Sequence, residues 1–255
     1  MLYKKTAGRG RPLYLLHGWA LNSRVWDSVI DELRSRWTVT TIDLPGHGKS
    51  ALPASGGYTL EALTDVIAPE IEPDAMIIGW SLGGMLAMNL ALHHPPLVSK
   101  LIMVASSPQF ARSADWPHAV DAEIIDGFAA NLCKDYRQTI LRFLAIQAMG
   151  SEHAREAIRG LREKVFLSGE PHILALQGGL DILLSTNLRP LLDRLSCDVQ
   201  FLLGEKDTLV PQLCGAASTA LIPGSRCDII AGAAHAPFVT HAKQFIQLVD
   251  GFLNE

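Results

Sequence analysis

The residues best suited to chemistry lie at positions 79–84, Gly-Trp-Ser-Leu-Gly-Gly. The apolar run at 75–78 is typical of a buried parallel strand, and the largely apolar run at 85–92 is typical of a buried helix. A strand that turns directly into a helix around Gly-x-Ser-x-Gly is a nucleophile elbow, whose glycines avoid the clash of Cβ atoms in a tight turn. The pattern predicts that Ser81 is a nucleophile standing above the sheet. The alternative is an ordinary glycine-rich turn that contains a serine.

A serine hydroxyl is a weak nucleophile at neutral pH and needs a base, which in turn needs an orienting acid. Asp207 follows an apolar strand at 199–203, and His235 lies in a small-residue loop after the last expected strand. Both positions lie past strand carboxyl ends, where open α/β sheets bind ligands. Glu205 competes with Asp207, which is preferred because the next helix begins just after it. The sequence therefore predicts a Ser81, Asp207 and His235 triad.

An oxyanion hole needs two backbone N–H groups aimed at the developing negative charge. We expect one from Leu82, the residue after the nucleophile, and one from Trp19, in the loop after the first core strand. Plain core packing is the alternative role for Trp19.

No metal or cofactor is expected. The sequence contains no His-Glu-x-x-His motif, and no glycine-rich dinucleotide fingerprint follows a strand. Gly48, Lys49 and Ser50 imitate the end of a phosphate-binding loop. That motif needs a glycine where Asp43 stands, so a nucleotide site is rejected.

The composition narrows the function classes. Of 255 residues, 19% are charged and 48% hydrophobic, with a net charge of −4, which excludes a disordered chain and a basic nucleic-acid binder. The four cysteines, at 133, 197, 214 and 227, form no C-x-x-C pair and read as reduced thiols. The N-terminus lacks a signal-peptide core, and no run approaches the roughly 18 apolar residues of a membrane span. A cytoplasmic monomer that binds neither nucleic acid nor a membrane is expected.

Strands and helices alternate along most of the chain, which predicts a doubly wound, mostly parallel α/β sheet. The rhythm breaks between residues 109 and 186, where the patterns are helical. We expect residues 1–108 and 187–255 to form the core and 109–186 an inserted helical lid over the strand ends. A separate helical domain is the alternative, disfavoured because neither border has a Pro/Gly/Ser-rich linker. The strands are expected at 13–16, 37–42, 75–78, 100–105, 199–203 and 227–230.

Over nearly its whole length the chain resembles the α/β-hydrolases, and more narrowly the pimeloyl-carrier-protein methyl ester carboxylesterases of biotin synthesis. The elbow alone would specify only the superfamily, whereas Trp80 inside it and a piece of the lid are narrower signals. The resemblance is carried by residues 15–19, 79–84, 104–108, 142–145, 147, 149–150 and 233–238.

The resemblance implies an enzyme that hydrolyses the methyl ester of a pimeloyl chain on acyl carrier protein, and short-chain esters as well, without a cofactor. It assigns the triad to Ser81, Asp207 and His235, and substrate contacts to Trp19 and Leu82. It also implies that a piece of the lid lines the substrate, namely Phe143, Leu144, Ala145, Ile146 and Gln147.

In that family, basic lid residues bind the acidic carrier, and Arg142, Arg155 and Arg159 stand at matching positions. A fourth family arginine falls at Gln138, with Arg137 one residue earlier and so about 100° away around a helix. The alternative interpretation of these arginines is a solvated helix face.

Two other function classes remain open. One is a different enzyme on the same fold: a C–C hydrolase, a lyase or a cofactor-free haloperoxidase. The other is a ligand receptor that keeps the triad but turns over slowly. All share the triad, so the lid and the pocket must distinguish them.

Overall fold

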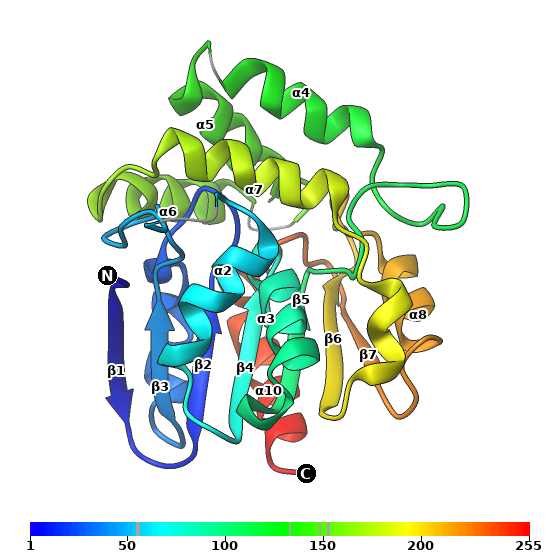
Figure 1. Ribbon diagram of the computed structural model, residues 1–255. Helices are drawn as coiled ribbons and strands as arrows, with labels where there is room; N and C mark the ends of the chain where they lie inside the picture. Colours follow the sequence, from blue (N-terminus) through cyan, green and yellow to red (C-terminus); the bar gives the residue numbers. More distant parts are fainter. Residues whose placement is uncertain (55–56, 133, 148, 152–153) are drawn as a thin grey trace.

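A computed structural model describes residues 1–54, 57–132, 134–147, 149–151 and 154–255, and shows seven strands in one sheet (Figure 1). The strand order is β1-β3-β2-β4-β5-β6-β7, in which β1 pairs antiparallel with β3 and every other pair is parallel. The predicted fold class is thereby confirmed. The strands are β1 (Lys4–Gly8), β2 (Pro12–Leu16), β3 (Thr38–Ile42), β4 (Ala75–Trp80), β5 (Val98–Val104), β6 (Asp198–Gly204) and β7 (Arg226–Ile230).

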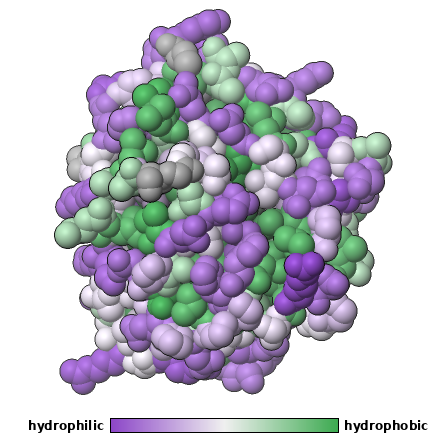
Figure 2. All heavy atoms as spheres, in the orientation of Figure 1, coloured by the Kyte–Doolittle hydropathy of each residue, from purple (hydrophilic) through white to green (hydrophobic). Residues whose placement is uncertain are grey.

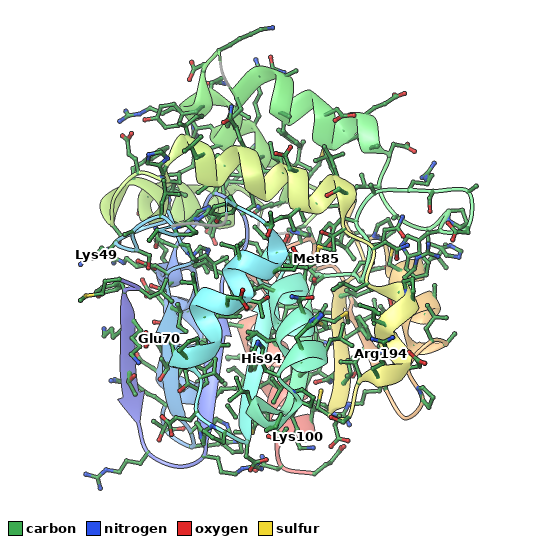
Figure 3. The ribbon with its side chains drawn as sticks, in the orientation of Figure 1. Lys49, Glu70, Met85, His94, Lys100 and Arg194 are labelled. Atoms are coloured by element: carbon green, nitrogen blue, oxygen red, sulfur yellow. The ribbon has the colours of Figure 1, made fainter. Side chains whose placement is uncertain are left out.

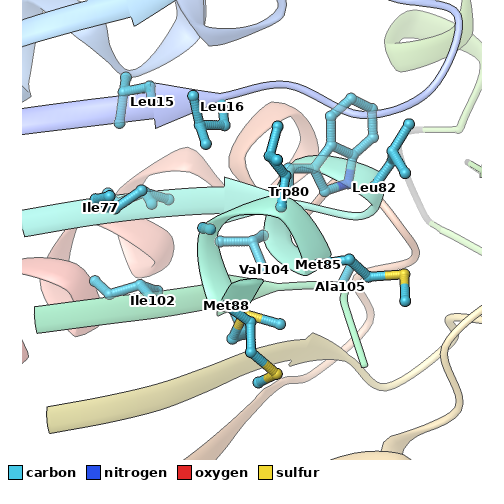
Figure 4. Close-up of a cluster of buried hydrophobic side chains, with 14 of the residues drawn as sticks. Leu15, Leu16, Ile77, Trp80, Leu82, Met85, Met88, Ile102, Val104 and Ala105 are labelled. Carbon is cyan, nitrogen blue, oxygen red and sulfur yellow. The ribbon is translucent and has the colours of Figure 1, made fainter. Parts of the chain in front are cut away.

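All six predicted strands are present, each within two residues of its expected bounds. The central strands are apolar without alternation because both faces of a parallel sheet are covered, and every residue of β4 is buried. Figure 4 shows this core, with Ile77 of β4 near Leu15 and Ile102 of the neighbouring strands, and Trp80 farther along β4 near Leu16.

The edge strand β1 was missing from the prediction. Its sequence, Lys-Lys-Thr-Ala-Gly, has no apolar alternation, and four of its five residues are exposed. It is a strand because its backbone pairs with β3, from Lys4 opposite Ile42 to Gly8 opposite Thr38. Lysines on an edge strand discourage pairing with a further chain, so such a strand carries little apolar signal.

Helices cover both faces of the sheet. In Figure 1, α2 and α3 lie in front of the strands and α10 lies behind them. Thr59 caps α2 by accepting a hydrogen bond from the Ala62 amide. The core helices are α1 (Ile30–Leu33), α2 (Leu60–Ile67), α3 (Leu82–His93), α8 (Gln212–Thr219), α9 (Pro237–Thr240) and α10 (Ala242–Leu253), with 3-10 turns η1 (Ser23–Ser28), η2 (Ala68–Glu70), η3 (Pro95–Leu97) and η4 (Arg189–Arg194).

The segment after residue 22 differs from the helix that its sequence predicts. The apolar spacing after residue 22 indicates a single helix, but the chain forms the 3-10 turn η1 and then the four-residue α1. Asn22 caps η1 by accepting from the Arg24 amide. Its side-chain amide also donates to the carbonyl groups of Lys164 and Val165. A contact with α6, far away in the sequence, therefore helps to hold Asn22 at the start of η1.

After a loop at residues 109–121, the described part of the chain up to residue 186 forms four helices, which lie above the strand ends at the top of Figure 1. Helical spacing of Val120, Ile124, Phe128 and Leu132 predicts one apolar face for α4, and the structure shows a different one. Ile125 is buried and Ile124 is 42% exposed, because α4 packs against α5 and α7 through Ile125, Phe128 and Leu132. Val120 precedes the helix. These helices are α4 (Ala122–Leu132), α5 (Tyr136–Gln147), α6 (Ala154–Leu167) and α7 (Ile173–Ser185).

The surface seen from the same side is largely hydrophilic, with apolar patches between the polar side chains (Figure 2). No helix in the described ranges is long and apolar enough to cross a membrane.

Candidate active site

Ser81 occupies the turn between β4 and α3. Its backbone lies at φ 54° and ψ −119°, a region that non-glycine residues rarely adopt and that marks functional strain. A Cβ atom on Gly79 would lie 2.5 Å from the Gly83 carbonyl oxygen, and one on Gly83 would lie 2.4 Å from the carbonyl oxygen of His17. Both elbow glycines are therefore required by close backbone approach.

His235 and Asp207 meet at the same end of the sheet. His235 Nδ1 lies 2.8 Å from Asp207 Oδ2, and the other carboxylate oxygen accepts hydrogen bonds from the amides of Leu209 and Val210. Both side chains are buried. The carboxylate thus has a fixed orientation and in turn fixes the imidazole ring.

Glu205, the competing acid, lies elsewhere. It is exposed, and its Oε2 accepts a hydrogen bond from the Gly232 amide. That amide and the nearby Lys206 ammonium hold the pKa of the Glu205 carboxyl below its usual value. The structure brings Asp207, and not Glu205, against His235.

The elbow and the histidine loop are joined through Trp80. Its indole N–H donates to the carbonyl oxygen of His235 at 2.7 Å, and the two rings lie 5.8 Å apart. His235 Nε2 is buried and has no hydrogen-bond partner among the residues that the structure describes. An imidazole with Nδ1 bonded to a carboxylate and Nε2 unengaged is arranged to accept a proton at Nε2.

The loop after β2 lies directly against the elbow, since a Cβ atom on Gly18 would lie 3.2 Å from the Ser81 Cβ atom. Leu82 is the first residue of α3, where amide groups have no partner within the helix. Within the described ranges, neither the Leu82 nor the Trp19 amide has an acceptor. The Trp19 side chain is buried, with its indole N–H donating to the Leu176 carbonyl of α7 at 2.8 Å.

Two buried histidines, which the sequence did not single out for a role, hold this loop. His17 Nε2 accepts from the Leu44 amide at 2.8 Å, and His47 Nε2 accepts from the Ala20 amide at 3.2 Å. Burial lowers the pKa of His17, and burial together with the nearby His17 lowers the pKa of His47 to about 3. Both rings are therefore neutral acceptors that position the backbone on either side of Trp19.

A narrow, largely filled cavity of about 20 Å³ lies beside Ser81. Apart from Ser81 its lining is entirely apolar, which fits a hydrocarbon chain. Most of its residues come from α4, α7 and the adjoining loops, which the sequence did not single out. The lining residues are Ser81, Phe110, Val120, Ile125, Phe128, Phe143, Leu180, Leu183 and Leu209.

Of the five lid residues expected to contact substrate, only Phe143 lines this cavity. Leu144 and Gln147 are buried, Ile146 is half-buried and Ala145 is exposed. Consecutive residues of a helix point in different directions, so a five-residue run of α5 cannot face one cavity.

The arginines expected to bind a carrier are on two neighbouring helices. Arg142, on α5, and Arg155 and Arg159, on α6, are exposed, and none forms an ion pair within the described part of the chain. Arg137 differs, because it pairs with Glu170 and its guanidinium lies 5.4 Å from the ring centroid of Phe166. Arg137 therefore joins the start of α5 to the segment after α6.

In the segment that imitates a phosphate-binding loop, the Asp43 carboxylate occupies the place where a phosphate would bind. Its carboxylate accepts hydrogen bonds from the amides of Ser23 and Lys49, and a Cβ atom on Gly48 would lie 2.2 Å from it. The exposed Lys49 ammonium lies over the ring of Tyr3 at the sheet edge, where Figure 3 labels it. Amides that would face a phosphate thus face a carboxylate.

No group of three or more potential metal ligands occurs among the described residues. Cys197, Cys214 and Cys227 are free, and burial raises the pKa of each thiol. Cys133 lies outside the described residues.

Comparison with known proteins places this geometry in a family. Residues 13–248 match the model of the alpha/beta hydrolase family. A pimeloyl-acyl-carrier-protein methyl ester esterase of Aeromonas hydrophila is 42% identical over 246 residues, which is 96% of each chain. An enzyme of the same name from Serratia marcescens is 40% identical over 253 residues, covering 99% of this chain and 98% of the relative.

Solved structures share the fold at lower identity. An esterase from Exiguobacterium antarcticum superposes with a TM-score of 0.89 at 22% identity, covering 100% of this chain and 96% of its own. A bromoperoxidase from Bacillus anthracis superposes with a TM-score of 0.88, also at 22% identity, covering 100% and 95%. At such identities these two likenesses establish the fold alone.

Proposed function

The chain belongs to the alpha/beta hydrolase family, and we propose that within it the protein is a serine carboxylesterase that hydrolyses the methyl ester of a pimeloyl chain held on acyl carrier protein. The observation that carries this proposal is the buried Asp207–His235 pair at the elbow, in a chain about 40% identical to esterases of that name over nearly its full length. The C–C hydrolase, lyase, haloperoxidase and receptor alternatives have no comparable support.

The proposed reaction begins when Ser81 Oγ attacks the ester carbonyl carbon and His235 Nε2 takes the hydroxyl proton. Asp207 holds the imidazole and stabilises the imidazolium that forms. The amides of Trp19 and Leu82 would donate to the carbonyl oxygen as it becomes negative. His235 then gives its proton to the methoxy oxygen, and methanol leaves an acyl-enzyme.

A water molecule completes the cycle. It loses a proton to His235 and attacks the acyl carbon, and the carboxylic acid is released as Ser81 regains its proton. The apolar cavity over Ser81 supports an uncharged substrate, since within the described ranges its lining offers no charged partner. A product that bears a carboxylate is accordingly held poorly and leaves.

The partner we propose is the acidic carrier, bound by Arg142, Arg155 and Arg159. Their exposure, and the lack of ion pairs to them within the described ranges, support a role toward an external anion. Arg137 is excluded from this set because Glu170 already engages it. Small free esters need only the cavity and are therefore proposed substrates as well. We also propose a monomer in the cytoplasm, where the free thiols would persist.

The test is a turnover assay with the pimeloyl carrier methyl ester beside a short-chain aryl ester, with release of methanol and of the aryl alcohol measured. Both should be hydrolysed, and a serine-directed phosphonate should label Ser81 alone. A label on another residue, or hydrolysis of neither ester, would contradict the proposal.

A further inference from the structure

We propose that Trp80 is a positioning residue for His235, and that its indole N–H and the carbonyl group of Gln147 together hold the histidine backbone in place. The inference rests on the proposed function, since it concerns how the general base is aimed at Ser81. It assigns Trp80 a role in the reaction although its side chain is fully buried.

Two hydrogen bonds hold the His235 backbone, one on each side of its Cα atom. The His235 amide donates to the Gln147 carbonyl at 3.0 Å, and the His235 carbonyl accepts from Trp80 Nε1 at 2.7 Å. These groups belong to the two peptide planes that flank the Cα atom. Fixing both planes fixes the direction of the Cα–Cβ bond, and so the place from which the imidazole projects.

The two anchors come from different parts of the molecule. Trp80 is the last residue of β4 and immediately precedes Ser81, as Figure 4 shows at the end of that strand. Gln147 is the last residue of α5, in the inserted segment. Asp207 adds a third anchor, which sets the rotation of the ring but not the position of its backbone.

Loss of the indole N–H would leave a buried carbonyl without a partner. An unpaired buried carbonyl costs free energy, so the peptide would turn toward another donor and take the His235 Cα atom with it. Misplacement of a catalytic group by about 1 Å can cost roughly 100-fold in rate. Binding of the ester would change little, because Trp80 does not line the cavity.

Trp26 provides a matched control for packing. Like Trp80 it is fully buried and contacts Phe238: the Trp26 and Phe238 rings lie 4.3 Å apart at 34°, and the Trp80 and Phe238 rings lie 5.0 Å apart, edge to face at 78°. Its indole N–H, however, has no acceptor among the described residues. The two tryptophans thus share full burial and a contact with Phe238, and they differ in the indole hydrogen bond and in the angle between the rings.

The experiment compares Trp80→Phe with Trp26→Phe on the short aryl ester, which needs no carrier. We expect Trp80→Phe to lower kcat by roughly 10- to 100-fold while KM stays within about threefold. The rate of phosphonate labelling of Ser81 should fall by the same factor, because it uses the same base. Trp26→Phe should leave kcat within about threefold, whatever its effect on Tm.

A second variant separates the N–H group from ring volume. Replacement of Trp80 by 3-benzothienylalanine keeps the bicyclic shape and substitutes sulfur for the N–H. The inference expects the same loss of kcat with Tm nearly unchanged. An unchanged kcat in this variant, or equal losses of kcat in the two phenylalanine variants, would overturn it.

The Ser81→Ala variant separates failure of the positioning role of Trp80 from failure of the proposed function. If that variant is inactive while the Trp80 variants keep full kcat, only the positioning role fails. If Ser81→Ala retains full activity, the reaction does not take place at the elbow, and both the proposed function and this inference fail.

Discussion

At the scale of single residues, the site was predictable wherever a local backbone requirement leaves a mark in the sequence. The glycines that its turn demands single out Ser81 as the candidate nucleophile, and Asp207 and His235 are candidates through their positions after expected strands. The residues lining the cavity left no such mark. Phe110, Leu180 and similar residues are apolar like any core residue, and only the packing of the lid brings them over Ser81.

The pairing of Asp207 with His235 yields a prediction with its control in the same loop. Asp207→Asn should lower kcat by about 10⁴-fold, because an amide at this position favours the wrong imidazole tautomer. Glu205→Gln should change kcat little, since Glu205 contacts the Gly232 amide and not the histidine. Steady-state kinetics on either ester tests the pair, and a larger loss in the Glu205 variant would show that the acid was misassigned.

The neutral histidines predict how stability depends on pH. The folded-state pKa values of His17 and His47 are depressed, so below about pH 6.5 the unfolded chain binds protons that the folded chain does not. Their contribution is therefore present above pH 6.5 and is lost as the pH falls toward 3. The slope should be up to about 1.4 kcal/mol per pH unit for each histidine.

Urea unfolding at pH 7.5, 6 and 5 measures this slope. His47→Gln removes one titrating group, so the free energy of unfolding of that variant should depend less steeply on pH than that of the parent. Parallel curves for the two proteins would contradict the assignment of His47 as a buried neutral acceptor.

At the scale of elements, the sequence predicted the strands better than the helix faces. A strand buried on both faces is apolar at most positions, so it can be recognised without knowing which face each residue occupies. The buried face of α4, by contrast, depends on the helices that pack against it. Ile125 rather than Ile124 turns inward because α4 rests on α5 and α7. The edge strand β1 was missed for the opposite reason, since it owes its existence to backbone pairing alone.

Arg189 joins the two ends of the inserted segment. Its side chain, only 13% exposed, donates to Gln109 Oε1 and to the Asp115 carboxylate, each at 2.8 Å, and lies over the ring of Trp116. The Ser113 hydroxyl and then the Arg189 guanidinium hold the pKa of the Asp115 carboxyl below its usual value. The side chain therefore ties the segment after β5 to the start of η4.

Arg189→Ala should lower the free energy of unfolding by roughly 1–3 kcal/mol, because it breaks charged hydrogen bonds and leaves Gln109 short of a partner. Arg194→Ala is the control, since Arg194, labelled in Figure 3, is exposed and has no ion pair within the described ranges. That variant should change stability by less than about 0.5 kcal/mol. Equal effects in urea titrations would mean that Arg189 does not fasten the segment.

At the scale of the whole molecule, charge is unevenly placed. The net charge is −4, yet α5 and α6 present Arg142, Arg155 and Arg159 without ion pairs in the described ranges. Arginines without ion pairs on one side of an anionic protein would attract an acidic partner to that side. Together with the apolar cavity beside Ser81, these arginines support the proposal that the carrier binds outside α5 and α6 while its acyl chain enters the cavity.

Replacing Arg142, Arg155 and Arg159 together by alanine should raise KM for the carrier-bound ester, more strongly at low salt, and leave the short aryl ester almost unchanged. The control replaces Arg9, Arg11 and Arg34, which changes the net charge equally but lies around the strand ends opposite the lid. Equal losses on both esters would mean that the lid arginines only hold the lid together. Equal effects of the two triple variants would mean that net charge alone matters.

The hydrogen bond from the Leu188 amide to the Pro108 carbonyl, 3.0 Å long, has a consequence for how such a protein can diversify. We propose that residues 109–186 are an insertion. Because Pro108 and Leu188 meet at its two ends, its exchange as a cassette would leave the order of strands unaltered. Every replacement segment would need a hydrogen-bond acceptor for the His235 amide, at the position that the Gln147 carbonyl now occupies. Recombination at this boundary would therefore be free to alter which substrates enter, provided that one backbone carbonyl is kept in place.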